Sequence, residues 1–272
     1  MKFDMNAAWN DAMAMIGANR EVLLVLAGVF FLLPALVATL VIPPVPPMLV
    51  ETPEDFQRLA EMVQAEMLQY WWVYALSLLA QMVGYLAMLA LLRHSERPTV
   101  GAALAGGFKA LLPAIAAYLL FSFALSLVLT VLLALTAVTG GIGALITVPL
   151  MLVGSIYVAV KVSLAAPVIA IEKVYNPAAV LLRSWRLTKG NSLRLFVFFL
   201  LIGVTYMVIA IVLGALVQGV ASLMGQDSGA LLVAFVSALL GSVFTVVMIA
   251  ALAAAHRQLS GPATGSYSGT FG

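Results

Sequence analysis

The stretch "LFVFFLLIGVTYMVIAIVLGALVQGVASL", residues 195–223, contains no Asp, Glu, Lys or Arg. A helix rises about 1.5 Å per residue, so about 20 apolar residues are enough to cross the hydrocarbon core of a bilayer. Five other apolar runs of similar length accompany this one, and only the fourth run contains a charge, Lys161. The six predicted spans are residues 22–42, 71–92, 111–138, 143–171, 195–223 and 230–255.

The composition supports this prediction. The chain is 64% hydrophobic and 9% charged, whereas a soluble domain carries about 25% charged residues. We therefore expect an all-α polytopic membrane protein with six transmembrane helices and additional interfacial amphipathic helices. Residues 1–259 are expected to form one membrane domain, and the Gly-, Ser- and Thr-rich residues 260–272 a disordered tail.

The distribution of cations predicts the orientation. Of the 13 Lys and Arg residues, 11 fall on the side of the membrane that carries both termini. Arg58 falls on the other side, and Lys161 lies within a span. Short loops rich in Lys and Arg stay in the cytoplasm, so both termini are expected there. An amphipathic segment followed by two spans begins near Met5, Thr99 and Asn176, which makes three parallel repeats an open alternative to six unrelated spans.

Two amphipathic segments in the loops carry recognisable helix signals. The first outer loop is predicted to form an acidic helix with Thr52 as its N-cap, Pro53 in its first turn and Asp55 three residues after the cap. On the inner side, residues 176–191 read "NPAAVLLRSWRLTKGN", in which Asn176 is a candidate cap and Gly190 a stop. One face of this second helix is apolar, and comprises Ala178, Leu181, Leu182 and Trp185.

Residues 166–196, "APVIAIEKVYNPAAVLLRSWRLTKGNSLRLF", resemble the membrane domain associated with some bacterial glycerophosphoryl diester phosphodiesterases and the YciC-type inner-membrane proteins. In that family a span ends in a Pro-containing apolar run and an acidic residue, here Pro167 and Glu172. A short helix, here containing residues 183–190, then leads into the next span. The resemblance implies a multi-pass protein of the bacterial inner (plasma) membrane. The phosphodiesterase activity belongs to a separate soluble barrel of roughly 250 residues, which we do not expect here.

Lys161 is the sharpest single feature within a span. If span 4 is one helix to residue 171, Lys161 lies roughly 15 Å deep, where a lysine costs about 2.5–3.5 kcal/mol. It either meets a lipid phosphate or an anionic substrate in a polar cleft, or extends to the inner surface. Candidate partners are the Ser163 carbonyl, Tyr157, Gln81 and Tyr85.

The cations of the inner helix are the other candidate site. Its apolar face would place Trp185 at the depth of the lipid headgroups and hold cations at the phosphate plane. The alternatives are that the arginines pair with Glu172 or Glu96, or that they bind a cytoplasmic partner. The predicted lipid- or anion-binding residues are Lys161, Arg183, Trp185, Arg186, Lys189 and Arg194.

Three functions remain open at this point. We favour a non-enzymatic membrane protein that organises or binds anionic lipid or a partner protein at the cytoplasmic face. The alternative is a transporter or flippase-like carrier of an amphipathic anion or lipid that uses Lys161. An intramembrane enzyme is the weakest, because no His, Cys, Asp or Glu lies in the predicted spans. We expect no catalytic residue, metal, cofactor or nucleic acid partner.

Overall fold

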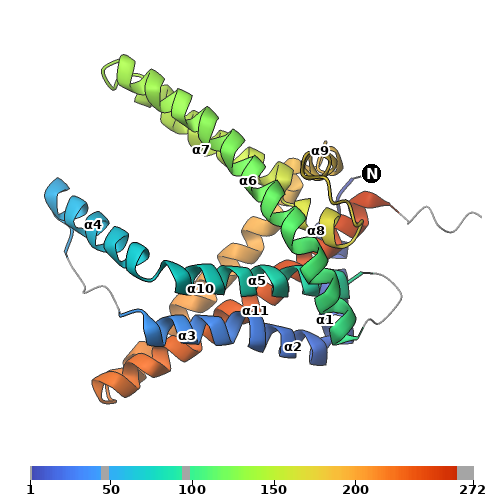
Figure 1. The fold of residues 1–272 in the computed structure, drawn as a ribbon, viewed down its shortest axis with the longest axis horizontal. Coiled ribbons are helices and arrows are strands. Elements are labelled where there is room, and N and C mark those ends of the chain that lie inside the picture. Colours follow the sequence, from blue (N-terminus) through green and yellow to red (C-terminus); the bar gives the residue numbers. More distant parts are fainter. Residues whose placement is uncertain (1, 44–48, 94–98, 262–272) are drawn as a thin grey trace, which may run out of the picture. The chain divides into compact units, whose positions relative to one another are not determined.

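The computed structural model describes residues 2–43, 49–93 and 99–261, and every regular element among them is a helix (Figure 1). The helices are α1 (Met5–Ala18), α2 (Arg20–Ala27), η1 (Gly28–Leu32), α3 (Leu33–Val41), α4 (Pro53–Gln69), α5 (Trp71–Leu91), α6 (Val100–Val138), α7 (Ala144–Val162), α8 (Ala165–Ala170), α9 (Pro177–Leu187), α10 (Ser192–Ala221) and α11 (Gln226–Ser260). The tail beyond Gly261, which was predicted to be disordered, and Glu96, a candidate ion-pair partner, lie outside the described residues.

The prediction of six spans is confirmed. In the described part of the chain, six helical segments are long and apolar enough to cross a membrane, so the chain is an all-α polytopic membrane protein. The segments are Arg20–Val41, Trp71–Leu91, Val100–Val138, Ala144–Ala170, Ser192–Ala221 and Asp227–Ser260. The third is much longer than predicted, because the amphipathic residues after Thr99 and the span itself form one continuous helix, α6.

The chain divides into two compact units, which are described separately. Unit 1 contains residues 1–20, 86–204 and 247–272, and unit 2 contains residues 21–85 and 205–246. Unit 1 holds α1, α6, α7, α8 and α9, whereas unit 2 holds η1, α3 and α4. Three long helices, α5, α10 and α11, contribute residues to both units.

In unit 2, the first span is interrupted by one π-helical turn, η1, directly before Pro34. A proline ring clashes with the carbonyl four residues earlier, and a wider turn relieves that clash. Gly84 of α5 lies so close to this turn that a Cβ there would overlap the side chain of Phe30. The close approach of these two segments therefore depends on glycine.

Helix α4, also in unit 2, begins as predicted. The Thr52 hydroxyl accepts a hydrogen bond from the Asp55 backbone N–H at 3.2 Å, and the Asp55 carboxylate accepts one from the Thr52 N–H at 3.1 Å. The hydrogen bond donated by the Thr52 side chain lowers the pKa of Asp55. The N-cap predicted at Thr52 is confirmed, and Asp55 extends it to a capping box.

In unit 1, the N-terminal helix α1 is joined to the end of α11. Ala8 and Ala12 are buried on one side of α1, and Asp11 forms an ion pair with Arg257. Two backbone groups before the helix bind side chains of the same unit: Phe3 N–H donates to Asn191 Oδ1 at 2.9 Å, and Asp4 N–H to Gln258 Oε1 at 2.9 Å. The amphipathic segment predicted to begin near Met5 thus packs on the protein through Ala8 and Ala12.

The fourth span consists of two helices rather than one. Helix α7 ends at Val162, a turn follows at Ser163 and Leu164, and α8 begins at Ala165. Pro167 explains the break, because it cannot donate to the Ser163 carbonyl and its ring would clash with that group. The depth predicted for Lys161 assumed one continuous helix to residue 171. Because the helix is broken after Val162, that depth does not apply.

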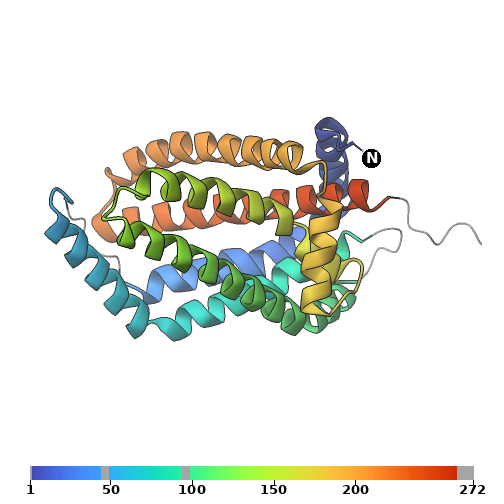
Figure 2. The ribbon, with the colours of Figure 1, turned by 90° about the horizontal axis from the view of Figure 1, so that it is seen from above.

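Helices α6 and α7 form a hairpin in unit 1, and α9 crosses one end of it. Figure 1 shows α6 and α7 side by side with α9 seen end-on, and Figure 2 shows α9 running crosswise to both. The hairpin turn contains Gly140 and Gly141, which adopt positive φ angles of 61° and 89°. The crosswise course of α9 brings its side chains to the hairpin and to the end of α7.

Candidate functional site

The basic helix α9 begins and ends where the sequence predicts. The Asn176 side chain accepts a hydrogen bond from the Ala179 N–H at 3.0 Å, and Pro177 occupies the first turn. After the helix, Gly190 has a φ of 79°, a conformation that glycine adopts without strain. Both the cap and the stop are therefore confirmed.

The buried face of α9 differs from the predicted apolar face. Val180, Ser184 and Leu187 are buried, and their spacing of four and three residues places them on one side of the helix. Leu182 and Trp185 are 51% and 40% exposed. The sequence did not indicate that Ser184 is buried, because a serine in a helix is ordinarily expected at the polar surface.

Ser184 attaches α9 to the end of α7. Its hydroxyl donates to the Lys161 carbonyl at 2.8 Å, and the Thr188 hydroxyl approaches the same oxygen at 3.4 Å. Carbonyls in the last turn of a helix have no partner within the helix. The helix break after Val162 thus creates the acceptor that α9 uses.

The Lys161 side chain lies against two aromatic rings. Its Nζ is 5.4 Å from the centroids of both the Tyr157 and Trp185 rings, which themselves meet edge to face at 6.0 Å. Cations are attracted to ring faces at this distance, and the last turn of α7 also favours a positive charge. Lys161 as a whole is only 3% exposed, so most of its side chain is covered by the protein.

Of the partners considered for Lys161, Tyr157 is the one that the structure places beside it within unit 1. Trp185 was predicted at the site, but as a headgroup anchor rather than as a partner of the lysine. Contact between the two could not be predicted, because it depends on the crosswise position of α9.

Glu172 joins three parts of unit 1. Its carboxylate accepts hydrogen bonds from Arg183 Nε at 2.9 Å and Nη2 at 3.1 Å, and it lies 2.9 Å from His256 Nε2. Burial opposes ionisation of this carboxyl, but the hydrogen bonds from Arg183 and His256 outweigh it and lower the pKa of Glu172. Of the alternatives left open by the sequence, pairing of an arginine with Glu172 is the one that the structure shows for Arg183. The part played by His256 was missed, because it lies 84 residues away in sequence.

The remaining predicted cations are exposed. Arg186 belongs to α9, Lys189 follows it, and Arg194 lies in the first turn of α10. Among the described residues, no carboxylate lies within ion-pair distance of any of the three. The structure therefore separates the predicted cations into one that is buried, Lys161, one that is paired with a carboxylate, Arg183, and three that are exposed.

Comparisons with family models, with curated proteins and with solved structures find no match to this chain. The fold and the site define a class, an all-α polytopic membrane protein with a basic amphipathic helix docked on a helical hairpin. The resemblance of residues 166–196 to the phosphodiesterase-associated membrane domain stays a prediction. In the part of the chain that the structure describes, no group of three His, Asp or Glu residues could hold a metal ion.

Proposed function

We propose that this chain is a non-enzymatic protein of the bacterial inner membrane that binds anionic lipid headgroups at the cytoplasmic face. The observation that carries the proposal is the group of exposed cations Arg186, Lys189 and Arg194, which have no acidic partner within ion-pair distance among the described residues. Arg183 is left out of the binding set, because Glu172 already holds its guanidinium group.

The distribution of cations along the sequence supports the assignment of α9 to the cytoplasmic face. The loop that contains α9 is the most basic in the sequence, and such loops stay in the cytoplasm. Leu182 and Trp185 remain half exposed beside the cations. A helix with apolar and basic groups side by side on its surface is suited to the boundary between headgroups and acyl chains.

Electrostatics sets the size of the effect. Each cation near an anionic leaflet contributes about 1 kcal/mol, so three cations contribute about 3 kcal/mol at most. This corresponds to roughly a hundredfold local preference for anionic over neutral lipid. The preference should weaken with salt, since the Debye length falls from about 10 Å at 0.1 M to about 3 Å at 1 M.

The carrier alternative depends on Lys161. In the structure this residue is 3% exposed, and its Nζ lies beside the rings of Tyr157 and Trp185. A carrier would therefore have to move one of these rings before the lysine could meet a phosphate. Lipid binding at Arg186, Lys189 and Arg194 needs no such rearrangement, and for this reason we favour it.

The test compares lipid selection by two variants with equal net charge. Purified protein is reconstituted into nanodiscs containing phosphatidylglycerol and phosphatidylcholine, and the lipids that remain bound after extraction into detergent are counted by native mass spectrometry. The site variant is Arg186→Gln/Lys189→Gln/Arg194→Gln. The control variant removes three exposed cations from the same side of the membrane: Arg20→Gln/Arg93→Gln/Lys109→Gln.

The site variant should lose most of its preference for phosphatidylglycerol, and the control should keep most of it, because its cations are dispersed. High salt should reduce the difference between them. If the site variant retains the complete phosphatidylglycerol complement at low as well as at high salt, lipid binding is wrong and docking of a cytoplasmic protein becomes the explanation for the exposed cations.

A further inference from the structure

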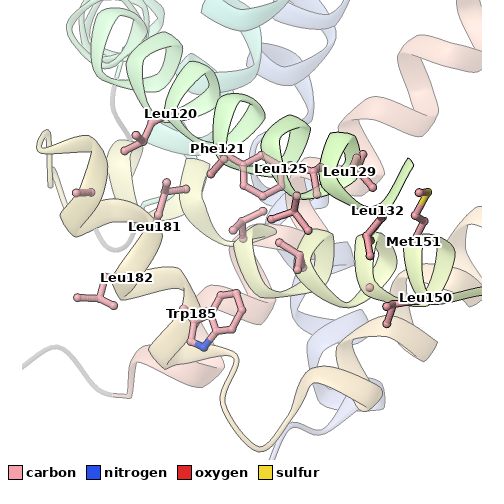
Figure 3. Close-up of a pocket in the computed structure, with 17 residues that line it drawn as sticks. Leu120, Phe121, Leu125, Leu129, Leu132, Leu150, Met151, Leu181, Leu182 and Trp185 are labelled. Carbon is pink, nitrogen blue, oxygen red and sulfur yellow. The ribbon is translucent and has the colours of Figure 1, made fainter. Parts of the chain in front are cut away.

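An apolar groove lies between α6, α7 and α9 within unit 1 (Figure 3). It has a volume of about 640 Å³ and is lined by 17 residues, none charged, among which Ser155 provides the only hydroxyl. Figure 3 shows Leu125, Leu129 and Leu132 of α6 along one wall and Leu150 of α7 along the other. The volume is within the range of about 300–1,000 Å³ that small-molecule sites occupy.

The groove is as long as an acyl chain in one leaflet. Its lining on α6 extends from Leu120 to Leu132, twelve residues that correspond to about 18 Å of helix. One leaflet contributes about 15 Å of hydrocarbon to the bilayer core. A single acyl chain could therefore lie along the hairpin over most of its own length.

Small residues keep the groove open. Gly154 lines it from α7, and a Cβ at this position would meet no atom within 4 Å. Ala124 lines the groove from α6. Larger side chains at these two positions would occupy space that the protein leaves unfilled, and an apolar space of this kind does not retain water well.

One end of the groove carries positive charge. Leu182 and Trp185 of α9 line it, and Arg186 is exposed four residues after Leu182, one turn further along the same side of α9. An apolar groove with a cation at one end matches a molecule that has a hydrocarbon chain and an anionic head.

We propose that this groove holds one acyl chain of an anionic phospholipid, with the phosphate of that lipid beside Arg186. The inference rests on the proposed function and deepens it, since it assigns a place to the chain as well as to the headgroup. It also gives α9 a double role: Leu182 and Trp185 cover the chain, while Arg186 selects the charge.

The test uses two photoreactive lipids that differ only in their headgroups. One is a phosphatidylglycerol and the other a phosphatidylcholine, each with a diazirine in the middle of one acyl chain. Protein in phosphatidylcholine nanodiscs containing a small share of either probe is irradiated, and labelled peptides are mapped by mass spectrometry. Gly154→Phe and Ala124→Phe fill the groove from opposite walls. Gly203→Phe of α10 is the matched control, because a Cβ there also meets no atom within 4 Å and Gly203 does not line the groove.

The phosphatidylglycerol probe should label peptides covering residues 120–132 and 150–158. Both filling variants should reduce this labelling by about tenfold, the factor expected from losing the burial of about two methylene groups. Gly203→Phe should not reduce it. Melting temperatures close to that of the wild type establish that the variants fold, and two independent filling variants guard against one of them misfolding.

The two ideas fail in different ways. If labelling of the groove peptides is the same in all four proteins, the groove does not hold the chain, and the acyl-chain inference is wrong while headgroup binding by α9 is unaffected. If both probes label the groove equally and filling removes the label from both, the groove holds a chain but the anionic selection fails, which contradicts the proposed function.

Discussion

Replacing Glu172 with glutamine should destabilise unit 1, because this carboxylate holds α9 and the end of α11 together. In Glu172→Gln, one oxygen remains as an acceptor, but the new amide group presents N–H donors to Arg183 and has no negative charge. His256 is 3% exposed, so it keeps at most a neutral acceptor and cannot replace the lost charge with water, whereas the Arg183 side chain is 42% exposed and can be partly rehydrated.

The size of the effect can be estimated from these contacts. A hydrogen bond to a charged group contributes about 1.5–3 kcal/mol. The contribution of Arg183 has to be discounted toward about 1 kcal/mol, because solvent screens a half-exposed pair. We therefore expect Glu172→Gln to lower the free energy of unfolding by about 2 kcal/mol, or the melting temperature by about 4–8 °C.

Thermal unfolding in detergent, followed by intrinsic tryptophan fluorescence, measures this effect. Arg183→Gln should lower the melting temperature less than Glu172→Gln, since Glu172 keeps His256 as a partner. Arg186→Gln is the matched control on the same helix and should change stability by less than about 0.5 kcal/mol. If Glu172→Gln melts within about 1 °C of the wild type, the carboxylate does not stabilise the unit and the reasoning is wrong.

Three other predictions concern the same unit. The lowered pKa of Glu172 means that its stabilisation is complete above the ordinary value of 4.5 and disappears as the pH falls through the lower folded-state pKa. The stability curves of the wild type and Glu172→Gln should therefore converge as the pH falls below 4.5, and parallel curves would contradict this. Lys161→Leu should raise the free energy of unfolding by about 1 kcal/mol, because Lys161 is buried without a carboxylate partner and the cost of burying its charge outweighs a cation–π attraction of about 2 kcal/mol. The same variant should keep its bound phosphatidylglycerol in native mass spectrometry, whereas loss of that lipid would revive the carrier alternative. Asn176→Ala should lower the free energy of unfolding by about 1 kcal/mol and accelerate hydrogen exchange in the first turn of α9. Asn176→Ser should preserve the protection of these amides, and equal exchange in both variants would exclude a capping role.

The features that could be predicted from sequence are those that depend on neighbouring residues. Hydropathy alone located all six spans, because a helix in lipid must be apolar over its whole length. The caps at Thr52 and Asn176 and the stop at Gly190 also followed from local chemistry. The break at Ser163 had a visible cause in Pro167, and giving that proline more weight would have predicted two helices in the fourth span.

The features that could not be predicted depend on how distant segments meet. Glu172 and His256 are 84 residues apart, and nothing in the spacing of either residue indicates the other. The sequence did not indicate which face of α9 packs on the protein, because Ser184 is buried by a hydrogen bond to a carbonyl that only the helix break exposes. The groove likewise exists only because α9 lies across the hairpin of α6 and α7.

Both proposals depend on α9 facing the cytoplasm, and labelling of single cysteines tests this claim most directly. The chain has no cysteine of its own, so Lys189→Cys and Asp227→Cys each introduce one reactive thiol, on opposite sides of the predicted topology. In intact cells, a membrane-impermeant maleimide should label the cysteine at position 227 and should label that at position 189 only after the inner membrane is opened. Equal labelling of both in intact cells, or labelling of position 189 alone, would contradict the orientation and with it the binding of cytoplasmic-leaflet lipid by α9.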